Sequence, residues 1–188
     1  MDSKNVSAEL RSEVRPLLKE RGFQQFTSRY AWRVLGDRVE VVNFQSFSDQ
    51  KARSLGCTSY SFAVNVGCYL RGIGSSPTFP SVAISNGKLP REYECHFRGK
   101  LTRSFEQPEL SRRDIWYVDS QGRYLAKAAH DVRMALARDG LEWFRVFDDQ
   151  SQVLRILREG DPSETLWGFG ARGSPARLFL LEQLGAKT

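Results

Sequence analysis

A helical pattern of apolar residues stops at Gly22 and passes directly into β-rich sequence. Five apolar residues recur at the spacing that lines one side of a helix: Val6, Leu10, Val14, Leu17 and Leu18. Gly22 is a typical helix stop. Pro16 lies inside the pattern, so the helix either kinks there or has its regular part begin there. The sequence therefore predicts an N-terminal helix over residues 6–21.

The next three segments predict a hairpin and a third strand. Two β-rich runs, residues 28–35 and 38–47, are separated by Gly36–Asp37, a two-residue hairpin signal. We expect a polar loop over residues 49–56. Residues 60–70 then alternate strictly between two faces, which is typical of a strand. One face consists of Phe62, Val64, Val66, Cys68 and Leu70.

A fourth alternating run follows a long loop that we expect over residues 71–90. Its apolar side chains are Tyr93, Cys95, Phe97 and Leu101, and its polar side chains are Glu92, Glu94, His96, Arg98 and Lys100. We predict a strand with one buried and one solvated face, followed by a short fifth strand over residues 115–118.

Helical patterns dominate the remainder of the chain. We predict a helix over residues 125–136 that ends at Asp139–Gly140, two shorter helices over 141–147 and 153–157, and a last helix from Ser174–Pro175 to Gly185. The predicted fold class is α+β, with an antiparallel sheet of about five strands, an N-terminal helix and a C-terminal helical segment. We expect a single domain over residues 1–188, with helix and sheet in 1–120 and a helical extension in 121–188.

Composition limits the compartment and the class of partner. No apolar run is long enough to span a bilayer, and the N-terminus lacks a signal-peptide pattern, so we expect a cytoplasmic protein without membrane contact. Three cysteines without short spacing argue against a disulfide framework. The formal net charge of +6 is spread thinly over the first two thirds of the chain, which favours an ordinary solvated surface over a nucleic-acid footprint.

The candidate catalytic motifs in the sequence are incomplete or wrongly placed. Gly168–Gly173 matches a dinucleotide fingerprint, but too little chain follows it for a βαβ unit. Cys95 and His96 resemble a nucleophile beside its base, but neighbours on a strand point to opposite faces. The cysteines and histidines have no metal-site spacing. We therefore expect neither a cofactor nor a metal, and enzyme status has no positive support.

The remaining candidate is a polar surface on the sheet. Basic and amide side chains on neighbouring strands would form it: Arg33, Asn43, Gln45, Asn65, His96, Arg98 and Lys100. Such donors suit phosphate or carboxylate groups. We expect a non-catalytic binding module that holds a protein partner or a small anionic ligand, and an immunity or inhibitor role also fits. The alternative is nucleic-acid binding through the basic strands of residues 28–103. The sequence leaves the oligomeric state open.

Several blocks of the sequence resemble a bacterial family of unknown function, DUF4304. The blocks are Leu17–Phe23, Trp32–Arg33, Val41–Gln45, Phe62–Gly67, Cys95–Arg98 and Asp114–Trp116. The similarity extends over most of residues 10–160. It implies a small bacterial cytosolic α+β protein, and it implies no catalytic residue because the family has no established activity.

Overall fold

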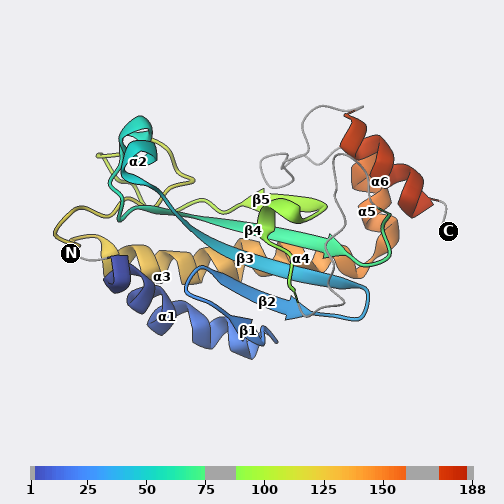
Figure 1. The fold of residues 1–188 in the computed structure, drawn as a ribbon, viewed down its shortest axis with the longest axis horizontal. Helices are drawn as coiled ribbons and strands as arrows, with labels where there is room; N and C mark the ends of the chain where they lie inside the picture. The colour runs from blue at the N-terminus through green and yellow to red at the C-terminus, as the bar shows by residue number, and fades with distance from the viewer. Residues whose placement is uncertain (1–2, 75–87, 160–173, 186–188) are drawn as a thin grey trace.

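The computed structural model describes residues 3–74, 88–159 and 174–185 and has an α+β fold (Figure 1). Its strands are β1 (Gln25–Phe26), β2 (Tyr30–Val34), β3 (Arg38–Ser46), β4 (Phe62–Leu70) and β5 (Phe97–Lys100). Its α-helices are α1 (Ser3–Glu20), α2 (Asp49–Leu55), α3 (Leu125–Ala135), α4 (Leu141–Arg145), α5 (Gln150–Glu159) and α6 (Pro175–Gly185). Shorter turns of 3-10 helix, η2 (Glu92–Glu94) and η4 (Val146–Asp148), and of π-helix, η3 (Leu136–Gly140), join them. The predicted α+β class is confirmed.

The five strands form one antiparallel sheet in the order β1-β2-β3-β4-β5. The predicted hairpin is present, and Leu35 N donates to Arg38 O (2.9 Å) across its turn. The predicted fifth strand at 115–118 is wrong: it forms only an isolated bridge between Trp116 and Phe62. The chain leaves the sheet there because Val118 N donates to the Ser61 hydroxyl (3.2 Å) and not to a strand carbonyl. The sheet still has five strands because the short strand β1, which the sequence did not predict, pairs with β2 at the edge of the sheet.

One face of the sheet is covered by helices and holds the main core. Helices α1 and α3 run side by side along this face, α2 lies at one end of the sheet, and α5 and α6 lie at the other (Figure 1). Val14 and Leu18 of α1 and Val132 of α3 pack with Val42 and Val66 of the sheet, all without exposed surface. The apolar face predicted for residues 62–70 is therefore the core face.

Two predictions need correction: the loop over residues 49–56 and the end of the helix over residues 125–136. Residues 49–56 were expected to form a polar loop but form α2, whose start is capped by the Ser48 hydroxyl and whose end is Gly56 in the left-handed region (φ 70°). Only Ala52 is buried in α2, so the helix has no apolar stripe in the sequence. The helix over 125–136 does not end at Gly140 but continues through η3 into α4. Gly140 allows close packing, since a Cβ there would lie 3.1 Å from Leu136 Cδ2, which would have to shift slightly.

The predicted fourth strand is confirmed only over Phe97–Lys100, because residues 92–94 form η2. The other predicted helices agree with the described structure. Helix α1 continues through Pro16, so it does not begin there. The two short helices correspond to α4 and α5, and Ser174 Oγ accepts from Arg177 N (3.4 Å) at the start of α6. Arg177 joins α6 to α5 by donating to Leu157 O (2.6 Å). Gly168–Gly173 and most of the expected 71–90 loop lie outside the described residues.

The second face of the sheet is partly covered by residues 88–95. Trp32 Nε1 donates to Pro90 O (2.8 Å), which fixes this segment over β2. Gly67 allows the contact with β4, because a Cβ at this position would lie only 2.8 Å from Cys95 Sγ. A smaller apolar cluster of Trp32, Val39, Val41, Tyr69 and Cys95 fills the space beneath the segment.

The three cysteines are free thiols, of which Cys68 and Cys95 are buried and Cys57 is partly buried. Within the described ranges, no helix is both long enough and apolar enough to cross a membrane.

Candidate functional site

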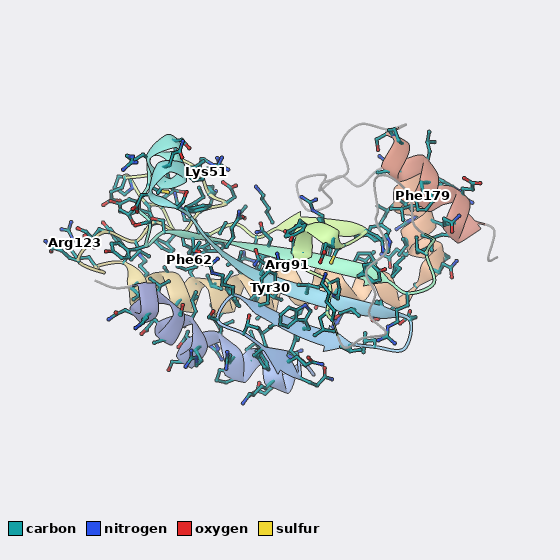
Figure 2. All side chains as sticks on the ribbon, viewed as in Figure 1. Tyr30, Lys51, Phe62, Arg91, Arg123 and Phe179 are labelled. Carbon is teal, nitrogen blue, oxygen red and sulfur yellow. The ribbon has the colours of Figure 1, made fainter. Side chains whose placement is uncertain are left out.

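A hollow of about 990 Å³ lies on the second face of the sheet, beside the segment 88–95. We call it the sheet-face pocket. Strands β1 and β2 with their connection form one wall, β3 and β4 form the floor, and residues 88–93 with β5 form the opposite wall. Its lining residues are Gln25, Thr27, Arg29, Tyr30, Trp32, Asn43, Gln45, Ser46, Asn65, Lys88, Leu89, Arg91, Glu92, Tyr93, Arg98 and Lys100. Figure 2 labels two of them, Tyr30 on β2 and Arg91 before η2, over the middle of the sheet.

The strand register aligns four lining residues in one row. Tyr30 pairs with Asn43, Asn43 with Asn65, and Asn65 with Lys100, so the row crosses β2, β3, β4 and β5. Directly paired residues of antiparallel strands point to the same face. An aromatic ring, two amides and an ammonium group therefore stand side by side across the floor of the pocket.

The amides of the floor form a hydrogen-bonded cluster. Asn65 Nδ2 donates to Asn43 Oδ1 (3.1 Å) and to Gln45 Oε1 (3.0 Å), and Asn43 Nδ2 donates to Arg29 O (3.3 Å). Asn65 is 3% exposed, and its Oδ1 accepts no hydrogen bond from the described residues. An unsatisfied buried acceptor costs about 1–3 kcal/mol. A donor from a ligand, or the ammonium of the adjacent Lys100, would relieve this cost.

Basic residues outnumber acidic ones around the pocket. Its lining contains Arg29, Lys88, Arg91, Arg98 and Lys100 but a single carboxylate, Glu92. Glu92 is already paired with Arg98 (3.0 Å). Burial raises the pKa of the Glu92 carboxyl, and the charges of Arg98 and Lys100 oppose this shift.

The cations of the pocket differ in whether they are already paired. Lys100 lies 3.6 Å from Asp114, whose pKa is lowered mainly by its hydrogen bond with Arg112. Arg29 and Lys88 have no ion-pair partner within the described part of the chain. Arg91 donates to the hydroxyl of Tyr93 (2.8 Å) and forms no ion pair within the described residues. These three cations are the charges that an incoming anion would meet.

The structure brings together five of the seven site residues expected from the sequence. Asn43, Gln45, Asn65, Arg98 and Lys100 all line the sheet-face pocket. Arg33 lies on the opposite, helix-covered face, where its guanidinium donates to Glu40 Oε2 (2.5 Å) and Arg21 O (2.6 Å) and lies 5.2 Å from the ring of Phe23. Arg33 is adjacent to Trp32, and alternation along β2 places the two on opposite faces.

His96 is buried, and its expected exposure beside Arg98 is wrong. It is 3% exposed, its ring centroid lies 4.6 Å from that of Tyr69, and its Nδ1 accepts from Leu70 N (3.0 Å). The predicted alternation fails here because residues 92–94 form η2 instead of a strand, so strand pairing begins only at Phe97. Burial lowers the pKa of His96 from 6.5 to about 4.

The buried His96 predicts a loss of stability in acid. Below about pH 6.5 the unfolded chain binds a proton at this residue that the folded chain binds only near pH 4. The contribution of neutral His96 to the free energy of unfolding is complete above pH 6.5. It falls by up to about 3 kcal/mol as the pH drops to about 4. Urea unfolding measures the free energy of unfolding of the wild type and of His96→Gln. The difference between these two free energies should become smaller as the pH falls from about 6.5 to about 4.

The chain contains a second histidine that serves as the control. His130 is exposed, so His130→Gln should keep the acid dependence of the wild type. A stability difference between wild type and His96→Gln that stays constant from about pH 7 to pH 4.5 would contradict the burial of His96.

Several lining residues were not expected from the sequence. Lys88, Arg91 and Tyr93 reach the pocket because the segment 88–95 folds back over the sheet, which no local pattern indicates. One signal was available: a glycine inside the alternating run 62–70 marks a place where another backbone approaches closely, and Gly67 is that place. Among the described residues, no group of three histidine, cysteine or acidic side chains is placed to hold a metal ion.

The fold and the pocket define a small α+β protein whose antiparallel sheet is covered by helices on one face and carries a basic hollow on the other. The chain belongs to the family described as a domain of unknown function (DUF4304), whose model matches residues 14–146. The match includes the whole sheet and every lining residue of the sheet-face pocket, and it confirms the resemblance seen in the sequence. Comparison with curated proteins and with solved structures found no match.

Proposed function

We propose that this protein is a non-catalytic binding module that holds an anionic ligand in the sheet-face pocket. The observation that carries the proposal is the charge of the lining: five basic side chains face one carboxylate, and three of them, Arg29, Lys88 and Arg91, have no carboxylate at ion-pair distance among the described residues. A cleft with lining of one sign raises the local concentration of counter-ions. Guanidinium and ammonium donors form charge-assisted hydrogen bonds with phosphate and carboxylate oxygens.

The amide floor adds recognition of uncharged groups. Asn43, Gln45 and Asn65 hold one another in place, so they present fixed donors and acceptors beneath the basic wall. Pockets of this kind bind through a few well-placed polar groups. In an immunity or inhibitor role, the anionic group would belong to a protein partner. We place the protein in the cytoplasm of a bacterial cell, in keeping with its free thiols.

Anion binding can be tested by NMR titration of the full chain with inorganic phosphate and with succinate at low salt. We expect saturable shifts of the Trp32 indole and of the Asn43 and Asn65 amide groups. The double variant Lys88→Ala with Arg91→Ala should weaken binding by about tenfold or more, because each charge-assisted hydrogen bond contributes about 1.5–3 kcal/mol.

The control removes the same two residue types elsewhere. Lys51, which Figure 2 shows on α2, and Arg133 on α3 are exposed and line no part of the pocket. Lys51→Ala with Arg133→Ala should bind both probes as the wild type does. Equal weakening by the two double variants, or the absence of saturable shifts, would refute the proposal.

A further inference from the structure

A second, smaller hollow of about 340 Å³ opens between α1 and the end of the sheet. We call it the N-terminal pocket. Lys4 and Arg11 of α1 line one side, and Tyr60 and several serines line the other. Two residues, Arg29 and Ser46, line both this hollow and the sheet-face pocket. Arg29 and Ser46 therefore lie between the two hollows, which are neighbours at this end of β2 and β3.

The charge of the lining continues from one hollow into the other. The basic residues of the N-terminal pocket are Lys4, Arg11 and Arg29, and its described lining contains no acidic residue. Glu92 is thus the one carboxylate along both linings, as far as the chain is described. A compact anion fills one hollow at most. A continuous basic path suits a linear ligand with a charge on every unit.

Aromatic and hydroxyl groups lie along the same path. Tyr30 and Tyr93 line the sheet-face pocket, where Tyr93 is 55% exposed, and Tyr60 lines the N-terminal pocket. Aromatic rings in a basic groove can stack with unpaired bases. Tyr30 already stacks on Trp32 (ring centroids 5.2 Å apart) and Tyr60 packs against the core, so Tyr93 is the most exposed of the three rings. Serine hydroxyls such as Ser28 and Ser59 are typical donors to phosphate oxygens. The Asn and Gln amides of the floor can hydrogen-bond to base edges.

We infer that the ligand is a single-stranded nucleic acid whose backbone passes from the sheet-face pocket over Arg29 into the N-terminal pocket. The inference rests on the proposed anion binding and names the class of ligand. An acidic peptide would match the charge but has no planar bases for the tyrosine rings. A duplex would match the charge but keeps its bases stacked within the helix.

The experiment compares a short strand with a single unit of it. Fluorescence anisotropy of the full chain would use an oligouridylate and an oligothymidylate of about 12 nucleotides, with uridine monophosphate as the one-unit competitor. We expect the oligonucleotides to bind far more tightly than the mononucleotide. With about four phosphate contacts, raising the salt from about 50 to 200 mM should weaken oligonucleotide binding about 50-fold.

Three arginine variants distinguish ligand binding in the N-terminal pocket from binding in the sheet-face pocket. Arg11→Ala, which changes only the N-terminal pocket, should weaken oligonucleotide binding about five- to tenfold and leave mononucleotide binding unchanged. Arg29→Ala should weaken both, and Arg133→Ala, outside both hollows, should weaken neither. Arg11, Arg29 and Arg133 are exposed, so all three variants should keep the melting temperature of the wild type.

The outcomes distinguish the inference from the proposed function. If the oligonucleotides bind no more tightly than the mononucleotide, or if Arg11→Ala has no effect, the extended path is refuted and anion binding in the sheet-face pocket stands. If a polyglutamate peptide of equal length, or a duplex, competes as well as the single strand, the class of ligand is refuted. If neither phosphate nor any nucleotide binds, the proposed function itself fails.

Discussion

Replacing Phe97 with alanine is expected to lower the free energy of unfolding by about 3–5 kcal/mol. Phe97 has no exposed surface and is the residue of β5 that enters the helix-covered core. Its ring centroid lies 4.9 Å from that of Phe147, so it joins the edge of the sheet to the helical layer. The substitution leaves a cavity that these surroundings can fill only in part. Urea unfolding followed by far-UV circular dichroism measures the loss.

Tyr93 provides the matched control for Phe97. It is an aromatic residue four positions earlier but is 55% exposed at the pocket wall. Tyr93→Ala should change the free energy of unfolding by no more than about 0.5 kcal/mol. If Phe97→Ala were as stable as Tyr93→Ala, the side of the sheet that β5 presents to the core would be assigned wrongly.

The sequence predicted the parts of the fold that follow from a regular period. Residues 62–70 alternate without interruption, so their core face could be assigned before the structure was known, and β4 shows that face. Phe97, Arg98 and Lys100 were placed correctly for the same reason. Hairpin chemistry at Gly36–Asp37 and the Ser174 cap were equally local, and each depended on a few neighbouring residues.

Elements without a period could not be predicted in this way. Helix α2 buries only Ala52, so its stability depends on capping at Ser48 and Gly56 and leaves no apolar stripe. The turn η2 shifts the chain between Glu94 and Phe97, which moves His96 out of the alternation and into a buried position. Such a shift depends on packing against Gly67, a contact between residues far apart in the chain.

The residues of the candidate site fall into the same two groups: those that strand alternation predicts and those that long-range contacts place. Asn43, Gln45 and Asn65 could be grouped from strand alternation alone, and the register pairs two of them directly. Their partners on the opposite wall, Lys88 and Arg91, come from a segment that reaches the sheet through the bond between Trp32 and Pro90. Long-range contacts of this kind have no local signature, so the sequence indicated the floor of the pocket but not its far wall.

Replacing Glu40 with alanine is expected to cost about 3–5 kcal/mol, which is the usual cost of removing one partner from a buried ion pair. Glu40 is fully buried on the helix-covered face, between Arg33 (2.5 Å) and Arg38 (2.9 Å). Burial raises the pKa of this carboxyl, and the two guanidinium groups act in the opposite direction. Without Glu40, Arg33 loses the carboxylate that it pairs with among the described residues, whereas Arg38 keeps Asp148 and Asp37. Thermal and urea unfolding at neutral pH measure the loss.

Asp37 separates the effect of burial from the effect of charge. Its carboxylate also lies near Arg38 (3.4 Å) but is 70% exposed, and exposed pairs contribute about 0–1 kcal/mol. Asp37→Ala should therefore remain close to the wild type, although it removes the same charge from the same guanidinium. Glu40→Gln keeps the shape and one acceptor, so its stability should lie between that of Glu40→Ala and the wild type. Equal losses for Glu40→Ala and Asp37→Ala would show that burial adds nothing to the ion pairs of Glu40, and would contradict its position in the core.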